Sequence, residues 1–318
     1  MWNICFNRIE NSNCYQLLLL AVARHFKRPY NTIKLNSYYP QYFAPDIQTL
    51  KNSIAERYYL DFTTAYNRFC RIGIEFYRRV GELTALLKTE LNNAPVGIFA
   101  DPFDCYWTTM YQKVHYSHAM LITGIDSENE HYLCRDIYYP QLGEIQLTGD
   151  ELSSLQKSLF TFIIGEPKTI TIEQKIGFLK NMFEAISDSE IETEQCAINN
   201  YFLHRFSIRD EIGDTADIKS SILLLNLLWI AEDKAAFASA LLELNTVLGK
   251  GVFDSAAEMV LYSRDLFGTL RAVLLKSAVA DTINPQSTLK IINEIYGTDR
   301  CIINEMRELL KNMEGASL

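Results

Sequence analysis

A chain of 318 residues, of which 48% are hydrophobic and 22% charged, has the composition of a globular protein with one large domain or two ordinary ones. Its net charge of -9 argues against general nucleic-acid binding. The longest apolar run, Leu17 to Ala23, is far shorter than the roughly 20 residues that a membrane span requires. No membrane partner is therefore predicted.

Seven cysteines are spread through the chain, with no CxxC pair and no tight cluster of Cys and His. This pattern predicts neither a disulfide framework nor a zinc site. Reduced thiols are typical of the cytoplasm. We therefore expect a cytoplasmic protein that uses no metal or other cofactor.

Charge is distributed unevenly along the chain. Residues 1–90 hold 12 Lys and Arg against 7 Asp and Glu, whereas residues 91–318 hold the acidic excess. A basic N-terminal third is typical of ordinary solvated helix faces, and it also fits a docking surface for an acidic partner protein. Both interpretations stay open at this point.

The first predicted element is a helix over residues 15–26, which is apolar almost all round and is therefore expected inside a domain. Ser12 and Asn13 are good N-cap residues, so the helix is expected to begin beside Cys14. Further helices are predicted over residues 46–65 and 69–91, the second with apolar residues at helical spacing.

After Pro95 the pattern changes to short runs that are typical of strands. These runs cover residues 96–100, 118–125, 131–137, 144–147 and 159–164. The polar stretch 126–130 predicts a turn that joins the second and third runs as an antiparallel hairpin. Amphipathic helices are predicted for the rest of the chain, near 172–186, 190–204, 217–231, 233–248, 252–280 and 286–312.

The segment Gly165-Glu166-Pro167-Lys168 follows the last predicted strand, and its Gly and Pro favour a domain boundary. We therefore predict a chain of α+β class, with a mixed domain over residues 1–166 and an all-helical domain over residues 167–318.

Cys14 has the position of a nucleophile. A thiol reacts as the thiolate, and the partial positive charge at a helix N-terminus favours that form. A lone cysteine is more often a small buried apolar residue, so Cys14 needs a matching base before it counts as catalytic.

His118 is the best candidate for that base, because it opens a predicted strand that can hold an imidazole rigidly. Of the other four histidines, only His115 is a serious rival. His25 lies about three turns along the first helix from the thiol, and His131 and His204 lie in the hairpin turn and the helical part. A hydrogen-bonded histidine at a strand end is the alternative for His118.

Two carboxylates compete for the role of orienting His118. Asp126 lies eight residues along the same strand, roughly 26 Å away at about 3.3 Å per residue. Asp136 lies on the returning strand, and the turn brings it to within a few residues of the position opposite His118. Asp136 is therefore the predicted third residue of a Cys14, His118, Asp136 triad.

Four segments together resemble the butirosin-biosynthesis-protein-H family, which is similar to the C39-type papain-like cysteine peptidases. The segments are Asn13-Cys14-Tyr15-Gln16-Leu17-Leu18, Pro95 through Asp101, His118 through Asp126, and Arg135-Asp136-Ile137-Tyr138-Tyr139. The order Cys, His, Asp is the papain-like order. The resemblance covers about residues 1–166 and implies a papain-like core, with a central helix packed on an antiparallel sheet.

The resemblance implies an acyltransferase. Members of the family take an acyl group from a phosphopantetheine thioester on a carrier protein and deliver it to a small amine, forming an amide bond in antibiotic and other natural-product assembly. Amide-forming enzymes of nonribosomal thioamide pathways look like the same machinery. A papain-like peptidase or thioesterase, with water as the acceptor, is the alternative, and a catalytically inactive binding protein is a third class.

The sequence departs from the papain-like pattern at the oxyanion hole. Papain-like enzymes carry a Gln several residues before the nucleophile, whereas this chain offers Asn11 and Asn13 there, besides the backbone N–H of Cys14. In the loop before His118, Asp101 and Asp104 are candidates for binding a cationic amine, and Trp107 and Tyr111 for covering an acyl chain. A solvated loop with one buried tryptophan is the alternative.

Overall fold

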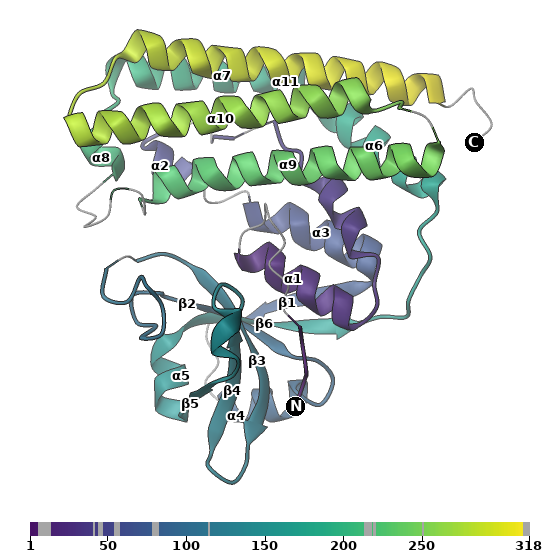
Figure 1. Cartoon of the computed structure of the whole chain (residues 1–318), viewed down its shortest axis with the longest axis vertical. Helices are drawn as coiled ribbons and strands as arrows, with labels where there is room; N and C mark the ends of the chain where they lie inside the picture. Colours follow the sequence, from purple (N-terminus) through teal and green to yellow (C-terminus); the bar gives the residue numbers. More distant parts are fainter. Residues whose placement is uncertain are drawn as a thin grey trace. The chain divides into compact units, whose positions relative to one another are not determined.

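A computed structural model divides the chain into two compact units, and each unit is described by itself (Figure 1). The first unit comprises residues 1–30 and 63–168, and the second comprises residues 31–62 and 169–318. The structure describes residues 1–5, 14–40, 42–43, 47–53, 58–77, 83–113, 115–212, 218, 221–249 and 251–313.

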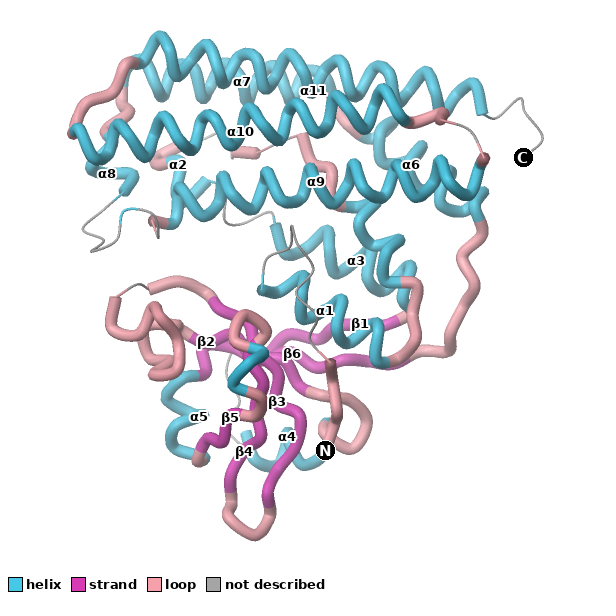
Figure 2. The backbone as a smooth tube through the Cα atoms, in the orientation of Figure 1, coloured by secondary structure: helices cyan, strands magenta, loops and turns pink. Residues whose placement is uncertain are grey.

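The first unit is a mixed α+β unit built around one sheet, whose strands are drawn in magenta in Figure 2. Its strands are β1 (Ile72–Tyr77), β2 (Val96–Ala100), β3 (His118–Asp126), β4 (His131–Asp136), β5 (Ile145–Leu147) and β6 (Gln156–Ile164). Its helices are α1 (Cys14–His25), α4 (Leu83–Glu90), the short 3-10 helix η2 (Pro140–Leu142) and α5 (Gly149–Leu155). Helix α3 (Tyr58–Cys70) spans the boundary between the two units.

The six strands are ordered β1-β6-β2-β3-β4-β5, and every neighbouring pair is antiparallel. The five predicted strands and the hairpin between β3 and β4 are confirmed, with ends that differ by up to three residues. Helix α1 packs against β3, and α5 packs against β4 and β5. The expected α+β class is thus found in this unit.

The prediction of one helix over residues 69–91 is wrong. The structure has strand β1 in its first part and helix α4 in its last part. Ile72, Ile74 and Phe76 alternate as they do in a strand, and β1 pairs with β6 from Ile72 opposite Ile164 to Tyr77 opposite Leu159. This alternation is a local strand signal that the helical interpretation overlooked, whereas the partner strand lies about 90 residues away in sequence and cannot be identified from it.

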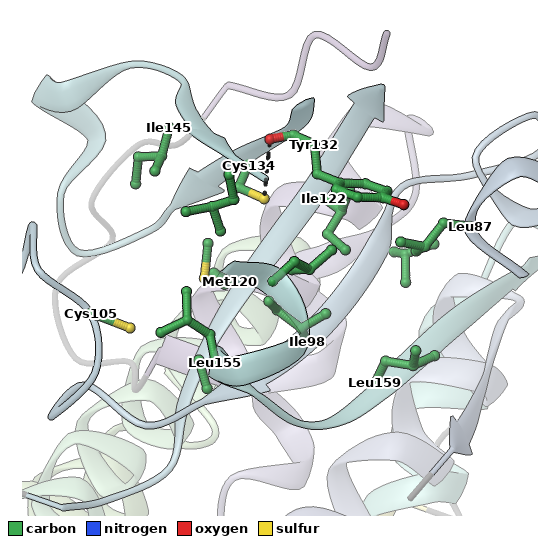
Figure 3. Packing of buried hydrophobic residues seen from close by; sticks show 14 residues of the cluster. Leu87, Ile98, Cys105, Met120, Ile122, Tyr132, Cys134, Ile145, Leu155 and Leu159 are labelled. Carbon is green, nitrogen blue, oxygen red and sulfur yellow. Dashed lines mark hydrogen bonds between the residues drawn. The ribbon is translucent and has the colours of Figure 1, made fainter. Parts of the chain in front are cut away.

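One face of the sheet is closed by a cluster of buried side chains, of which Figure 3 labels ten. Met120 and Ile122 of β3 lie there with Ile98 of β2, together with Leu152 and Leu155 of α5. Burial of such apolar side chains is the main stabilising contribution to a unit of this size. The cluster also includes a residue of the loop between β2 and β3, so this loop is packed against the sheet.

An aromatic cluster fixes the start of α1. The Tyr15 ring lies 5.5 Å from Phe99 and 5.4 Å from Phe160, centroid to centroid. Phe160 lies so close to Gly97 that a Cβ atom on Gly97 would be 2.1 Å from its ring, so only glycine fits there. Because Tyr15 follows Cys14 directly, these contacts also set the place of the Cys14 thiol.

The second unit is all-helical. It contains the 3-10 helix η1 (Tyr30–Asn36, whose first residue belongs to the first unit), α2 (Leu50–Ser53), α6 (Ile172–Ala185), α7 (Asp188–His204), α8 (Ile208–Ile212), α9 (Ile222–Leu248), α10 (Asp254–Ala280) and α11 (Pro285–Met313). The two helices predicted over 217–231 and 233–248 are one continuous helix, α9. No helix among the described residues is long and apolar enough to cross a membrane.

Residues 31–62 belong to the helical unit, whereas the sequence analysis placed them in the domain of residues 1–166. Buried carboxylates of the later helices hold this segment. Glu194 of α7 accepts hydrogen bonds from the backbone N–H groups of Tyr42 and Phe43 at 2.7 and 3.0 Å. Glu211 of α8 accepts two more, from Leu50 and Lys51. Such pairing between distant segments leaves no periodic trace in the sequence.

A third buried carboxylate, Asp299 of α11, is paired with the equally buried Lys234 of α9 at 2.8 Å. The Tyr38 hydroxyl donates to Asp299 at 3.4 Å, and the Tyr42 hydroxyl donates to it as well. The Lys234 ammonium also lies over the Tyr38 ring, 4.8 Å from its centroid. The charge of Asp299 is therefore neutralised and hydrogen-bonded inside the unit.

We predict that Lys234→Met lowers the free energy of unfolding by about 3–5 kcal/mol, because Asp299 would remain buried without its counter-charge. Arg264→Met is the matched control, since Arg264 pairs with Asp265 at the surface and should cost less than about 1 kcal/mol. Urea unfolding followed by circular dichroism measures both. Equal losses in the two variants would contradict the assigned role of the buried pair.

Candidate active site

Cys14 is the first residue of α1, and its side chain is 4% exposed. The helix is held from two sides, because Tyr15 packs on the sheet and the Tyr66 hydroxyl of α3 donates to the Leu19 carbonyl at 2.9 Å. The thiol therefore lies where the first N–H groups of a rigid helix have no partner within the helix.

His118 and Asp136 are brought together by the register of the hairpin. Asp136, the last residue of β4, lies opposite Met120, two residues along β3 from His118. Residues two apart on a strand share a face, so the two side chains meet. His118 Nε2 lies 2.8 Å from Asp136 Oδ2, and both residues are 1% exposed. Because a carboxylate accepts hydrogen bonds, Nε2 is the donor.

The Asp136 carboxylate has two further donors. The Trp107 indole Nε1–H donates to Oδ2 at 2.8 Å, and the Tyr138 backbone N–H donates to Oδ1 at 2.9 Å. Burial alone raises the pKa of Asp136, but the positive charge of His118 and these hydrogen bonds outweigh burial and hold the pKa below its usual value. Asp136 is therefore an anion over the whole neutral range.

The pKa of His118 is shifted in the opposite direction, upward. Burial alone lowers its pKa, but the charge and hydrogen bond of Asp136, with a smaller contribution from Cys14, raise the pKa of His118 to about 10. The other ring nitrogen, Nδ1, is buried and makes no hydrogen bond of standard geometry to the described residues. Since Asp136 occupies Nε2, Nδ1 is the nitrogen that can exchange a proton with the Cys14 thiol.

Two tyrosines border the pair, and the sequence analysis did not single out either. The ring of Tyr138 stacks on His118 with centroids 5.6 Å apart, and the ring of Tyr116 meets it edge-on at 6.3 Å. Burial raises the pKa of Tyr116, with further contributions from Cys14 and Asp136, so its phenol stays neutral. The signal in the sequence was their position: Tyr116 precedes His118 by two residues, and Tyr138 follows Asp136 by two.

His115, the rival base, has a different partner. Its Nδ1 lies 2.9 Å from Asp101 Oδ2, and the Phe103 ring stacks on it with centroids 4.0 Å apart. The His115 side chain is 68% exposed, whereas Asp101 is buried. The two histidines thus form separate pairs with different aspartates. Only in the buried pair does Cys14 contribute to the raised pKa of the histidine, His118.

The other residues proposed for the site fall into three groups. Asp101 is turned inward to His115, and Trp107 donates to Asp136, so both polar groups are already engaged within the protein. Asp104 and Tyr111 are exposed on the same loop. The oxyanion candidates Asn11 and Asn13 lie outside the described residues.

Asp126 is at the far end of β3, as the sequence analysis expected. Its carboxylate accepts hydrogen bonds from the backbone N–H of Glu128 at 3.0 Å and from the Asn129 side chain at 2.8 Å. These bonds, that of Asn129 first, hold the pKa of Asp126 below its usual value. Asp126 thus stabilises the hairpin turn.

All seven cysteines are free thiols, and the structure distinguishes them by burial. Burial, assisted by nearby carboxylates, raises the pKa of Cys105 to about 12, and burial raises the pKa of Cys134 further. Both thiols are therefore protonated and poorly nucleophilic at neutral pH. In the described part of the chain, no group of three or more His, Cys, Asp or Glu side chains is arranged to hold a metal ion.

We expect Asp136→Asn to slow turnover at Cys14 by roughly 10³-fold or more, because the amide cannot balance an imidazolium at His118. Asp126→Asn removes the same charge from the neighbouring strand and should change the rate by less than about threefold. Single-turnover kinetics with a small thioester compare the two variants. The reverse ranking would show that the wrong carboxylate has been assigned to His118.

A comparison with models of known protein families finds none that matches this chain, and a comparison with curated proteins gives no significant match. The interpretation of the site therefore depends on its own geometry: a buried His118–Asp136 pair beside a thiol at a helix N-terminus.

Proposed function

We propose that the protein is a papain-like cysteine acyltransferase that forms an amide bond, with Cys14 as nucleophile, His118 as acid and base, and Asp136 as the group that orients His118. The observation that carries the proposal is the buried hydrogen bond between His118 and Asp136 next to the first residue of α1. A helix that starts at a cysteine and packs on an antiparallel sheet bearing histidine and aspartate supports a papain-like core.

The raised pKa of His118 and the lowered pKa of Asp136 support a resting pair of His118 imidazolium and Asp136 carboxylate. In the proposed reaction, the proton on His118 Nδ1 comes from the Cys14 thiol, which leaves a thiolate. The thiolate attacks the carbonyl carbon of a thioester, and the tetrahedral oxyanion that forms is stabilised by the N–H groups at the start of α1. The oxyanion then collapses and expels the donor thiol, which leaves with the proton from His118.

Acyl transfer to the amine restores the resting state. The amine attacks the acyl group on Cys14, and neutral His118 takes the proton that the amine nitrogen releases. The carbon–sulfur bond breaks, so an amide and a Cys14 thiolate beside a His118 imidazolium are formed. Asp136 stays ionised throughout, because its three hydrogen-bond donors remain in place.

The proposed donor is a phosphopantetheine thioester on an acyl or peptidyl carrier protein, and the proposed acceptor is a small amine of a natural-product pathway, as the family resemblance implies. The basic N-terminal third supports an acidic carrier protein as partner. Arg28 of this third is not available for docking, since it is buried and donates to the Gly165 carbonyl, whereas Lys27, Arg68 and Lys88 are exposed. Hydrolysis through the same triad, as a peptidase or thioesterase, is the competing function.

We predict that Cys14→Ala abolishes turnover and removes the thiol that iodoacetamide labels fastest at pH 7, because the thiolate is the nucleophile. Peptide mass spectrometry resolves the labelled cysteines. Cys134→Ala is the control and should retain activity, since that thiol is buried and protonated. An active Cys14→Ala variant, with fast labelling at Cys105 or Cys134 instead, would rule out Cys14 as the nucleophile.

A second prediction separates the two functions. When an acyl thioester on a carrier protein is supplied with a diamine, amide product should exceed free acid, as measured by mass spectrometry of the products. Raising the salt concentration should reduce use of the carrier-bound donor, because exposed charges are screened over about 8 Å at physiological ionic strength. Free acid in excess at saturating amine, or efficient cleavage of an unmodified peptide, would favour the hydrolase.

A further inference from the structure

We propose that Trp107 is a positioning residue of the active site, whose indole N–H fixes the Asp136 carboxylate and thereby makes the reactivity of Cys14 depend on the loop between β2 and β3. This inference rests on the proposed function and deepens it. It also replaces the role of acyl-chain contact that the sequence suggested for Trp107.

The geometry places the indole and the imidazole on the same oxygen. His118 Nε2 and Trp107 Nε1 both lie 2.8 Å from Asp136 Oδ2, while the Tyr138 N–H holds Oδ1 at 2.9 Å. Three donors from three parts of the chain hold both oxygens of the carboxylate and thereby fix its position and plane. Hydrogen bonds to a charged acceptor are roughly twice as strong as those between neutral groups, so the indole contributes to the charge state as well as to packing.

Several hydrogen bonds hold the loop between β2 and β3 that carries Trp107. At its ends, His115 bonds to Asp101. At its middle, the Thr109 backbone N–H donates to the Tyr139 hydroxyl at 3.0 Å. The Thr108 hydroxyl donates within the loop to the carbonyl groups of Pro102 and Cys105. These hydrogen bonds hold the loop in place and thereby hold the indole N–H against Asp136. A change that frees the loop removes this hydrogen-bond donor from the carboxylate.

Several titratable groups surround Asp136, and they decide the sign of the effect. His118 of β3 and Cys14 of α1 form the reacting pair, while Cys105 of the loop and Tyr116 before β3 stay protonated at neutral pH. Without the indole N–H, the Asp136 carboxylate loses one of the three donors that fix its plane, and a carboxylate that turns away from His118 Nε2 supports the imidazolium less well. We therefore expect that a higher pH is needed to reach the same rate of alkylation at Cys14.

The test is the pH dependence of iodoacetamide alkylation at Cys14, between pH 5 and 9 as a working range, in the full chain. Peptide mass spectrometry measures the rate at Cys14, with the exposed Cys196 and Cys301 as internal references. Trp107→Phe keeps an aromatic ring and removes the donor. We expect its alkylation midpoint to rise by about 0.5–1 pH unit, and the rate at pH 6 to fall about three- to tenfold.

Trp2→Phe is the matched control, because the Trp2 indole also donates a 2.8 Å hydrogen bond in the first unit, to the Leu91 carbonyl. It removes the same kind of bond without touching Asp136, so its midpoint should equal that of the wild type. Circular dichroism and urea midpoints establish that both variants fold. An unchanged midpoint in folded Trp107→Phe, or an equal shift in Trp2→Phe, would overturn the positioning role.

A double-mutant cycle identifies the route of the effect. If the indole acts through the carboxylate, Trp107→Phe should lower the alkylation rate of an Asp136→Asn protein by less than about twofold. A full, additive loss in the double variant would show that Trp107 acts in another way. If wild-type Cys14 reacts no faster at pH 6 than Cys196 and Cys301, the proposed function fails, and the positioning role fails with it. A fast wild-type thiol with an unshifted Trp107→Phe variant overturns the positioning role alone.

Discussion

The Asp136 carboxylate is the group on which the candidate site depends. A carboxylate that is 1% exposed is stable in that place only if its oxygens are hydrogen-bonded and its charge is balanced. Its partners come from strand β3, from the loop between β2 and β3, and from the backbone after β4. One side chain, Asp136, therefore links three features of the site. These are the register of the β3–β4 hairpin, the position of the loop between β2 and β3, and the protonation of His118.

The scaffold around this group explains why the thiol is also in place. The Tyr15 ring packs against the sheet residues Phe99 and Phe160, and the close approach of Phe160 requires glycine at position 97. The N-terminus of α1 is thus fixed against the same sheet that carries His118 and Asp136. A rigid helix and a rigid hairpin position the proposed nucleophile and base, as accurate catalysis requires.

The helical unit uses the same physical rule for a structural purpose. Glu194, Glu211 and Asp299 are buried, and each is satisfied by backbone N–H groups, hydroxyl groups or Lys234. The first two draw their backbone donors from the segment between α1 and α3, which ties that segment to helices far along the chain. A unit built from two separate stretches of sequence follows from this pairing.

The sequence alone was enough to predict the elements whose signals are local. It predicted five of the six strands, the hairpin and most of the later helices, because alternation, turn residues and helical spacing are visible within a short window. It also paired His118 with Asp136 rather than Asp126, since a hairpin limits which residues can meet. Tertiary structure decided the pairing of β1 with β6, the assignment of residues 31–62 to the helical unit, and the partners of Trp107 and Asp101. Each of these depends on contacts between segments distant in sequence, and such contacts override local propensity without leaving a pattern that can be read along the chain.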